Sequence, residues 1–137
     1  MITLKQYFGD KPHTPEQEEN AIDLLWRVNG LLKEAADNGA YNYPIDVDTG
    51  TQISGSRNGT GDGGFRLPNA ATGAALSSHK EAKGLDVFDP VGLLDSWITD
   101  EVLAKYGLYR EHPHHTVGWS HLTTRKPASG ARSFRIK

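Results

Sequence analysis

Three residues, His79, Asp86 and His121, are of types that together hold one divalent metal ion. Two imidazole nitrogens and one carboxylate oxygen form the ligand set of catalytic zinc sites, where a fourth position stays open for water or substrate. The sequence contains no cysteine, which excludes thiolate ligands, disulfides and a cysteine nucleophile. Zinc is the metal that a His, His, Asp set favours, and we expect it here.

The spacing of His79 and Asp86 requires the chain to turn between them. Ligands of one zinc ion lie about 2.0 to 2.2 Å from it, whereas seven residues span about 10 Å along a helix and about 23 Å along a strand. We expect Gly84 to provide the reversal, because glycine adopts positive φ at little cost. Short strands at 85–88 and 117–122 would then bring Asp86 and His121 to the same point.

Two amphipathic helices are expected around these strands. Thr14 is a suitable N-cap with Pro15 at the first helical position, and apolar residues repeat at three and four positions until Gly39. A second helix is expected from Pro90 to Gly107. With further short strands at 52–54 and 108–110 and a glycine-rich loop at 59–64, the pattern predicts an α+β fold with a mainly antiparallel sheet.

Length and composition agree with one small domain covering residues 1–137. The net charge of −2 gives no electrostatic footprint for nucleic acid or anionic lipid. The first ten residues lack the pattern of a signal peptide, and no apolar run approaches about 18 residues, so we expect neither a signal peptide nor a membrane span. The chain is expected to be soluble as made.

Several motifs resemble a known group. Ser77-x-His79 followed by Asp86, and Trp119-x-His121, are similar to the two ligand motifs of the zinc D-alanyl-D-alanine peptidases and bacteriophage wall peptidases of the M15 family. The resemblance implies the hedgehog/DD-peptidase fold, a zinc cofactor and hydrolysis of peptidoglycan peptide bonds beside a D-amino acid. It also implies a phage-encoded or bacterial cytoplasmic protein that acts at the cell wall, expected here as a monomer.

The same resemblance suggests which residues contact substrate. The segment 54–57, SGSR, resembles the family's SGYR, so Arg57 is expected to clamp a peptide carboxylate through its planar two-pronged guanidinium. Ser77 is expected to contact substrate, and to shape the turn or hydrogen-bond a metal ligand rather than act as a nucleophile. Trp119 is expected to wall the site. A plain structural role remains open for Arg57 and Trp119, Trp97 is expected in the core, and His13 is left out of the site.

The sequence departs from the family pattern at the catalytic base. Gly118 stands where better-known members carry an acid, and a glycine has no carboxyl group. Glu111 is the leading candidate, because LYREHP resembles a glutamate-containing segment of short phage relatives and precedes the strand that returns to His121. His115 or His114 is the alternative. Other departures are Ser56 for the aromatic residue of SGYR, and the exchange of glycine and alanine at positions 82 and 84.

Two other functions stay open from the sequence. Gly118 favours a metal-stabilised wall-binding module that does not hydrolyse its ligand. The ligand set alone would also suit a metallohydrolase acting on another small amide, which the surrounding motifs do not suggest.

Overall fold

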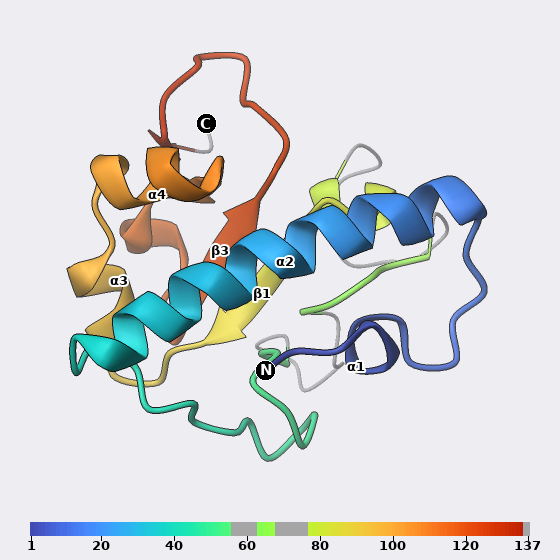
Figure 1. Cartoon of the computed structure of the whole chain (residues 1–137), viewed down its shortest axis with the longest axis horizontal. Coiled ribbons are helices and arrows are strands. Elements are labelled where there is room, and N and C mark those ends of the chain that lie inside the picture. The colour runs from blue at the N-terminus through green and yellow to red at the C-terminus, as the bar shows by residue number, and fades with distance from the viewer. Residues whose placement is uncertain (56–62, 68–76, 136–137) are drawn as a thin grey trace.

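Helix α2 (Pro15–Asp37) lies across one face of a small sheet and is the longest element of the computed structural model, which describes residues 1–55, 63–67 and 77–135 (Figure 1). The Thr14 side chain accepts a hydrogen bond from the Gln17 backbone N–H at 3.1 Å, and the Gln17 side chain accepts one from the Thr14 N–H at 2.8 Å. This reciprocal cap satisfies two backbone donors that have no partner within the helix. The predicted long helix and its capping residue are confirmed.

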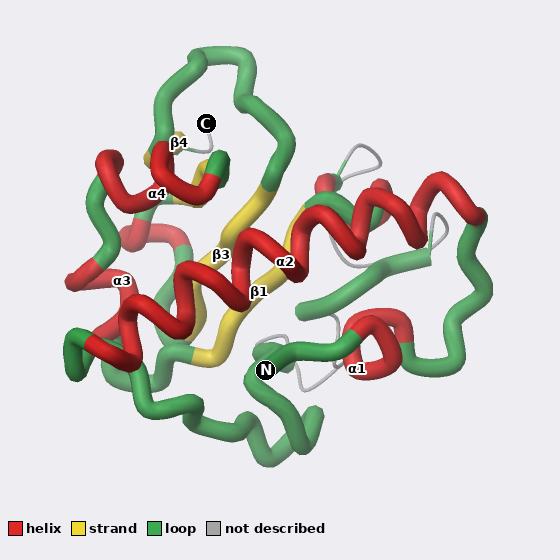
Figure 2. Tube along the Cα trace, in the orientation of Figure 1, coloured by secondary structure: helices red, strands yellow, loops and turns green. Residues whose placement is uncertain are grey.

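The sheet contains four strands in the order β1-β3-β2-β4 (Figure 2). Strand β1 (Gly84–Phe88) pairs antiparallel with β3 (Trp119–Thr123), which pairs antiparallel with β2 (Tyr109–Glu111). Strand β4 (Ser133–Phe134) runs parallel to β2. The α+β class is confirmed. The sheet is mixed because β4, which follows β3 after a long loop, pairs in parallel with the edge of β2 that β3 does not occupy.

The core lies between α2 and the sheet. Successive side chains of a strand point to opposite faces, so Leu85 and Val87 face the core that they share with α2, whereas Asp86 faces away from it. Leu122 of β3 lies on the same apolar face. The α2 residues that are buried in this core are Ala21, Leu24, Leu25, Val28, Leu31, Leu32 and Ala35. Trp97 is half-buried against the core, as expected.

The outer edge of β1 is covered by backbone from two other segments. The Asp86 N–H donates to Gly63 O at 2.8 Å, and the Ser54 N–H donates to Asp86 O at 2.8 Å. Segment 52–54 therefore meets β1 as a single bridge, Ile53 to Val87, rather than as the predicted strand. These bonds hold the backbone of Asp86 on the side away from β3.

The region 90–107 differs from the single helix expected there. It forms α3 (Leu93–Trp97) and α4 (Asp100–Tyr106), because Ile98 is extended at φ −63° and ψ 129° and the Thr99 side chain caps a new helix by accepting the Val102 N–H at 3.2 Å. A fourth helix, α1 (Leu4–Phe8), was not predicted, although Thr3 and Gln6 form a second capping box. Single-turn 3-10 helices are η1 (Ser78–Glu81) and η2 (Pro113–His115).

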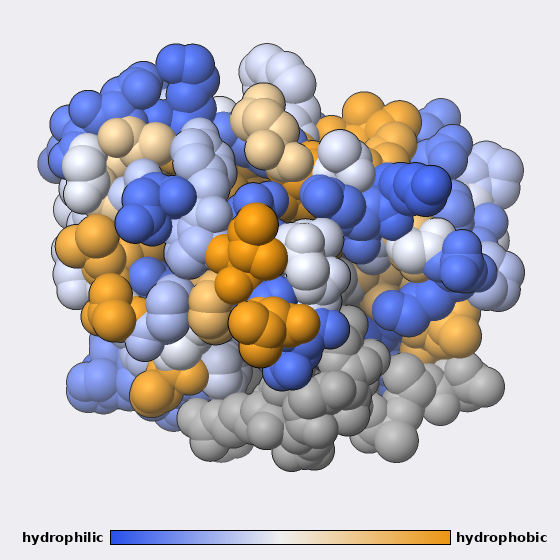
Figure 3. Space-filling view, turned by 90° about the horizontal axis from the view of Figure 1, so that it is seen from below, coloured by the Kyte–Doolittle hydropathy of each residue, from blue (hydrophilic) through white to orange (hydrophobic). Residues whose placement is uncertain are grey.

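The surface is mainly polar on the face shown in Figure 3, where apolar residues form small groups among charged ones. Single exposed apolar residues of this kind are ordinary on protein surfaces. Over the described parts of the chain, none of the helices has the length and apolar character that crossing a membrane requires.

Replacing Asp89 should destabilise the turn from β1 to α3. This buried carboxylate accepts the backbone N–H groups of Leu94 at 3.0 Å and Asp95 at 2.9 Å. We expect Asp89→Ala to lower the free energy of unfolding by about 1 to 3 kcal/mol, because two buried donors lose their acceptor, whereas the exposed Asp10→Ala is near neutral. Urea unfolding of both variants measures this, and equal midpoints would contradict it.

Candidate metal centre

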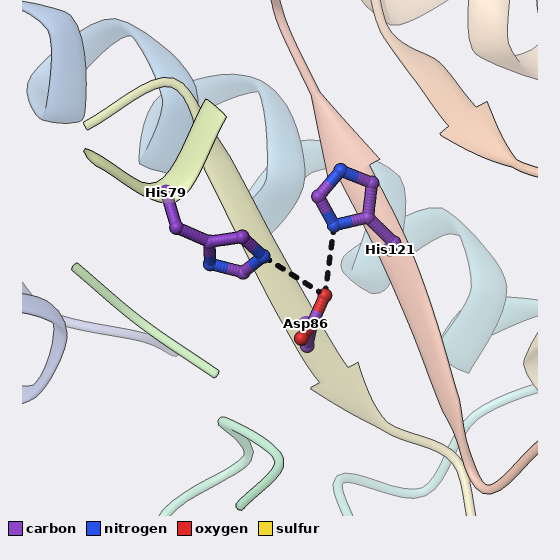
Figure 4. A group of neighbouring side chains, drawn as sticks. All are labelled: His79, Asp86 and His121. Atoms are coloured by element: carbon purple, nitrogen blue, oxygen red, sulfur yellow. Dashed lines mark hydrogen bonds and ion pairs between the residues drawn. The ribbon is translucent and has the colours of Figure 1, made fainter. Parts of the chain in front are cut away.

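Two of the expected metal ligands lie opposite each other on neighbouring strands. Asp86 of β1 is the register partner of His121 of β3, so both side chains leave the sheet on the same face. His79 reaches the same point from η1, which precedes β1 (Figure 4). The structure therefore brings together the three residues that the sequence singled out, and they are buried, with exposed fractions of 3%, 8% and 8%.

The turn between His79 and Asp86 differs from the expected one. The left-handed residue is Ala82, at φ 58°, rather than Gly84, which begins β1. Gly84 is required for space instead, because a Cβ atom there would lie 2.2 Å from Ser78 Oγ and 3.2 Å from His121 Cε1. The exchange of glycine and alanine at these positions thus has two consequences. Ala82, which is fully buried, adopts a left-handed backbone conformation that is unfavourable for alanine. Gly84 packs directly against Ser78 and His121.

The donor atoms are close enough to share an ion. His121 Nδ1 lies 2.8 Å from Asp86 Oδ1, His79 Nε2 lies 3.3 Å from the same oxygen, and a ligand atom from each residue lies within 4.8 Å of the others. Ligands in a tetrahedral zinc site are about 3.4 Å apart. The two distances to Asp86 Oδ1 lie close to this value.

The hydrogen bonds of His79 show why the site suits a cation. His79 Nδ1 lies 2.9 Å from Gly64 O, and because a carbonyl only accepts, Nδ1 carries the hydrogen. If Nε2 carries no proton, its lone pair faces the carboxylate of Asp86 at 3.3 Å, and two acceptors then oppose each other. A positive ion between them, or a proton, removes that repulsion. The donor set and its outer hydrogen bond therefore fit a metal such as zinc.

Asp86 is ionised in these surroundings. Burial alone would raise the pKa of its carboxyl, but the imidazoles of His79 and His121 outweigh burial and hold that pKa well below its usual range. Arg66 lies on the other side, with Nη2 at 3.6 Å from Asp86 Oδ2. The buried carboxylate thus has nitrogen groups on both oxygens.

Arg66 was missed by the sequence analysis, which selected Arg57. Its side chain is about 10% exposed, and its backbone N–H donates to His79 O at 3.2 Å, which ties its segment to η1. The available signal was an arginine between the apolar residues Phe65 and Leu67, since a charge in an apolar stretch is buried only with a partner. Arg57 lies outside the described residues.

Glu111 of β2 continues the row of side chains that crosses the sheet from Asp86 on β1 to His121 on β3. The β2–β3 register pairs Arg110 with Leu122, and one further step places Glu111 opposite His121. Burial raises the pKa of Glu111 and the charge of Asp86 adds to this, whereas His121 and Arg66 act in the opposite direction. Its electrostatic coupling to these three residues agrees with a position beside the candidate centre.

Aromatic residues flank this row. Phe134 of β4 is the register partner of Glu111, and its ring meets the His121 ring edge-on with centroids 6.3 Å apart. Trp119 is the partner of Phe88 two residues along the strands, on the same face as His121, and is half-buried. This position is consistent with the expected wall.

The other predicted site residues do not contact the donor atoms of the candidate centre in the described parts of the chain. The Ser77 hydroxyl accepts the His79 N–H at 3.3 Å and caps η1, which agrees with shaping the turn. His114 and His115 are exposed in η2, and within the described chain no hydrogen bond or ion pair joins them to the three ligands. Gly118 has φ 97°, a conformation that disfavours an acidic side chain there.

Comparisons of this chain with protein-family models, with characterised proteins and with solved structures gave no match.

Zinc should stabilise the folded protein if the three ligands bind it. At a free zinc concentration about 100 times the dissociation constant, binding adds about 2.7 kcal/mol, which corresponds to a rise in Tm of about 8 °C for a domain of this size. Thermal unfolding with EDTA and with zinc measures the rise. We expect it to disappear in Asp86→Asn, and an equal rise in that variant would place the ion elsewhere.

Glu111→Gln should stabilise the metal-free protein at high pH. Because the folded pKa of Glu111 is raised, ionising it opposes folding, and stability is lost as the pH rises from its ordinary value of 4.5 through the raised folded value. The uncharged amide avoids that loss. We expect the Tm advantage of the variant in EDTA to be full at pH 8 and to vanish below about pH 4.5. An advantage independent of pH would contradict this.

Proposed function

We propose that this protein is a zinc-dependent peptidase that hydrolyses peptide bonds of peptidoglycan, most simply a bond beside a D-amino acid. The observation that carries the proposal is the convergence of His79, Asp86 and His121 on one buried point, with Glu111 next in the row. The motif resemblance to the M15 peptidases supports the substrate class, and the convergence of its ligand residues supports the resemblance.

Each ligand residue contributes in a defined way. His79 presents Nε2 because Nδ1 is occupied by Gly64 O, and Asp86 contributes a carboxylate that is already ionised. Zinc held there would polarise the scissile carbonyl and lower the pKa of water. Two imidazoles and one carboxylate would leave a bound zinc ion with a position free for water, as hydrolysis requires.

Glu111 is the proposed general base. Its carboxylate would take a proton from the attacking water and return it to the leaving amine, so that one side chain serves both steps. A raised pKa suits this role, because a base that is too acidic holds the proton poorly at the second step. Glu111 thereby replaces the acid that Gly118 lacks.

Arg66 has a supporting role in this proposal. Its guanidinium lies beside Asp86 and couples electrostatically to Glu111, so it offsets part of the negative charge of two neighbouring carboxylates. Arg57 and Trp119 remain the proposed contacts for the substrate carboxylate and the substrate wall. The hedgehog/DD-peptidase fold belongs to the same proposal.

A metal-stabilised wall-binding module is the second candidate. It is favoured by Gly118 in place of the usual acid and by the burial of all three ligands, since a structural ion needs no access to substrate. Under this alternative zinc stabilises the protein and the wall is bound, but no peptide bond is cut.

The two candidates separate in one experiment. Purified protein is incubated with zinc and peptidoglycan of several wall types, and new amino termini are identified by mass spectrometry. We expect His121→Ala to form no product, and Glu111→Gln to be slower by about 10²- to 10⁴-fold while still binding zinc. His13→Ala, a histidine stacked on Phe8 outside the centre, is the matched control and should keep full activity.

Other outcomes have clear meanings. A Glu111→Gln variant with full activity beside an inactive His115→Gln would make His115 the base. If wild-type protein binds zinc and sediments with cell walls but releases no new amino termini from any of them, the peptidase is wrong and the binding module is correct.

A further inference from the structure

The two imidazoles of the candidate centre have different partners on their outer sides. His79 Nδ1 faces the carbonyl of Gly64, which only accepts hydrogen bonds. His121 Nε2 instead lies 3.3 Å from the hydroxyl of Ser78, which both donates and accepts. Ser78 is 5% exposed and His121 is 8% exposed, so water is largely kept from this contact.

Without an ion, the hydrogen of His121 belongs on Nδ1. This atom lies 2.8 Å from the ionised carboxylate of Asp86, which can only accept. Nε2 then carries a lone pair, and the Ser78 hydroxyl is the group in position to donate to it. In this state Ser78 is the donor.

With an ion on Nδ1, the same ring needs its hydrogen on Nε2. The Nδ1 proton leaves to solvent and Nε2 takes one from solvent, so no net proton is gained or lost by the ring. The new N–H then requires an acceptor. The Ser78 oxygen serves as that acceptor once its own hydrogen rotates away. A carbonyl in place of the hydroxyl could only accept a hydrogen bond and would suit only the metal-bound state. An N–H group could only donate and would suit only the metal-free state.

The position of Ser78 is fixed from both sides. The backbone N–H of Lys83 donates to Ser78 O at 2.9 Å, which closes the turn of η1. Opposite, a Cβ atom on Gly84 would lie 2.9 Å from Ser78 Cβ, so this strand position has room only for hydrogen. The hydroxyl is thereby held against the His121 ring.

We propose that Ser78 is a positioning residue that lets His121 change tautomer when the metal binds, whereas His79 is permanently set for binding by Gly64. This inference rests on the zinc site of the proposed function and gives a role to the unspecified position between Ser77 and His79 of the first ligand motif. It needs no catalytic activity, so it is tested on the protein with zinc alone.

The first measurement uses the wild-type protein labelled with ¹⁵N in its histidine rings. We expect long-range ¹H–¹⁵N spectra in EDTA to show His121 with its hydrogen on Nδ1, and spectra with zinc to show a slowly exchanging hydrogen on Nε2. His79 should keep its hydrogen on Nδ1 in both. If His121 has the same tautomer in both samples, the proposal is wrong.

The second measurement compares Ser78→Ala with Ser120→Ala by zinc titration against a competing chelator. Ser120 is a buried serine of β3 on the face opposite to His121, so it controls for the loss of a buried hydroxyl. We expect Ser78→Ala to bind zinc about tenfold more weakly, the lower end for loss of an outer hydrogen bond, and to lose the slowly exchanging Nε2 hydrogen. Ser120→Ala should match wild type in both.

The outcomes separate this inference from the proposed function. Equal zinc affinity in wild type and Ser78→Ala overturns the role of Ser78 and leaves the peptidase proposal intact. A tautomer change with weakened binding in Ser78→Ala supports the inference even if no peptide bond is ever cut. Wild-type protein that binds no zinc overturns both.

Discussion

The buried carboxylate of Asp86 is the group around which the rest of the candidate centre is arranged. Removing an ionised carboxylate from water costs several kcal/mol unless other charges and hydrogen bonds offset it. Here His79 and His121 approach one oxygen, and Arg66 approaches the other. The backbone of the same residue is hydrogen-bonded to Gly63 and Ser54, which fixes the position of the carboxylate. The desolvation of the carboxylate is offset by groups from η1, β3 and the segment 63–67.

The register of the sheet brings these groups together. Asp86 and His121 must be direct partners, because a slip of one residue would turn one of them into the apolar core under α2. The leucines and valine on the other face fix the register through burial, and the polar residues then follow on the open face. Packing on one side of the sheet thus determines the chemistry on the other.

Much of this was predictable from residue types. The helix that begins after Thr14 and the strands around Asp86 and His121 follow from local patterns, and the structure confirms them. It also brings the three predicted ligand residues together in a buried group that could hold a metal ion. The turn was predicted with the wrong residue in the left-handed conformation, because Gly84 is needed for its close approach to Ser78 and His121 in the folded chain, a contact that the sequence does not show. Thr99 split the expected second helix, although its capping signal was visible in TDEV. Arg66 could not be placed, because its partner is distant in sequence and no spacing rule connects them. The peptidase activity, its substrate and the family remain proposals.

The ligands differ in how firmly the chain holds them. Asp86 and His121 belong to strands paired along their length, so moving either backbone means opening the sheet. His79 sits on one turn of 3-10 helix, whose hydrogen bonds are fewer and less well aligned. An ion bound there would therefore have two ligands on paired strands and one on a single helical turn.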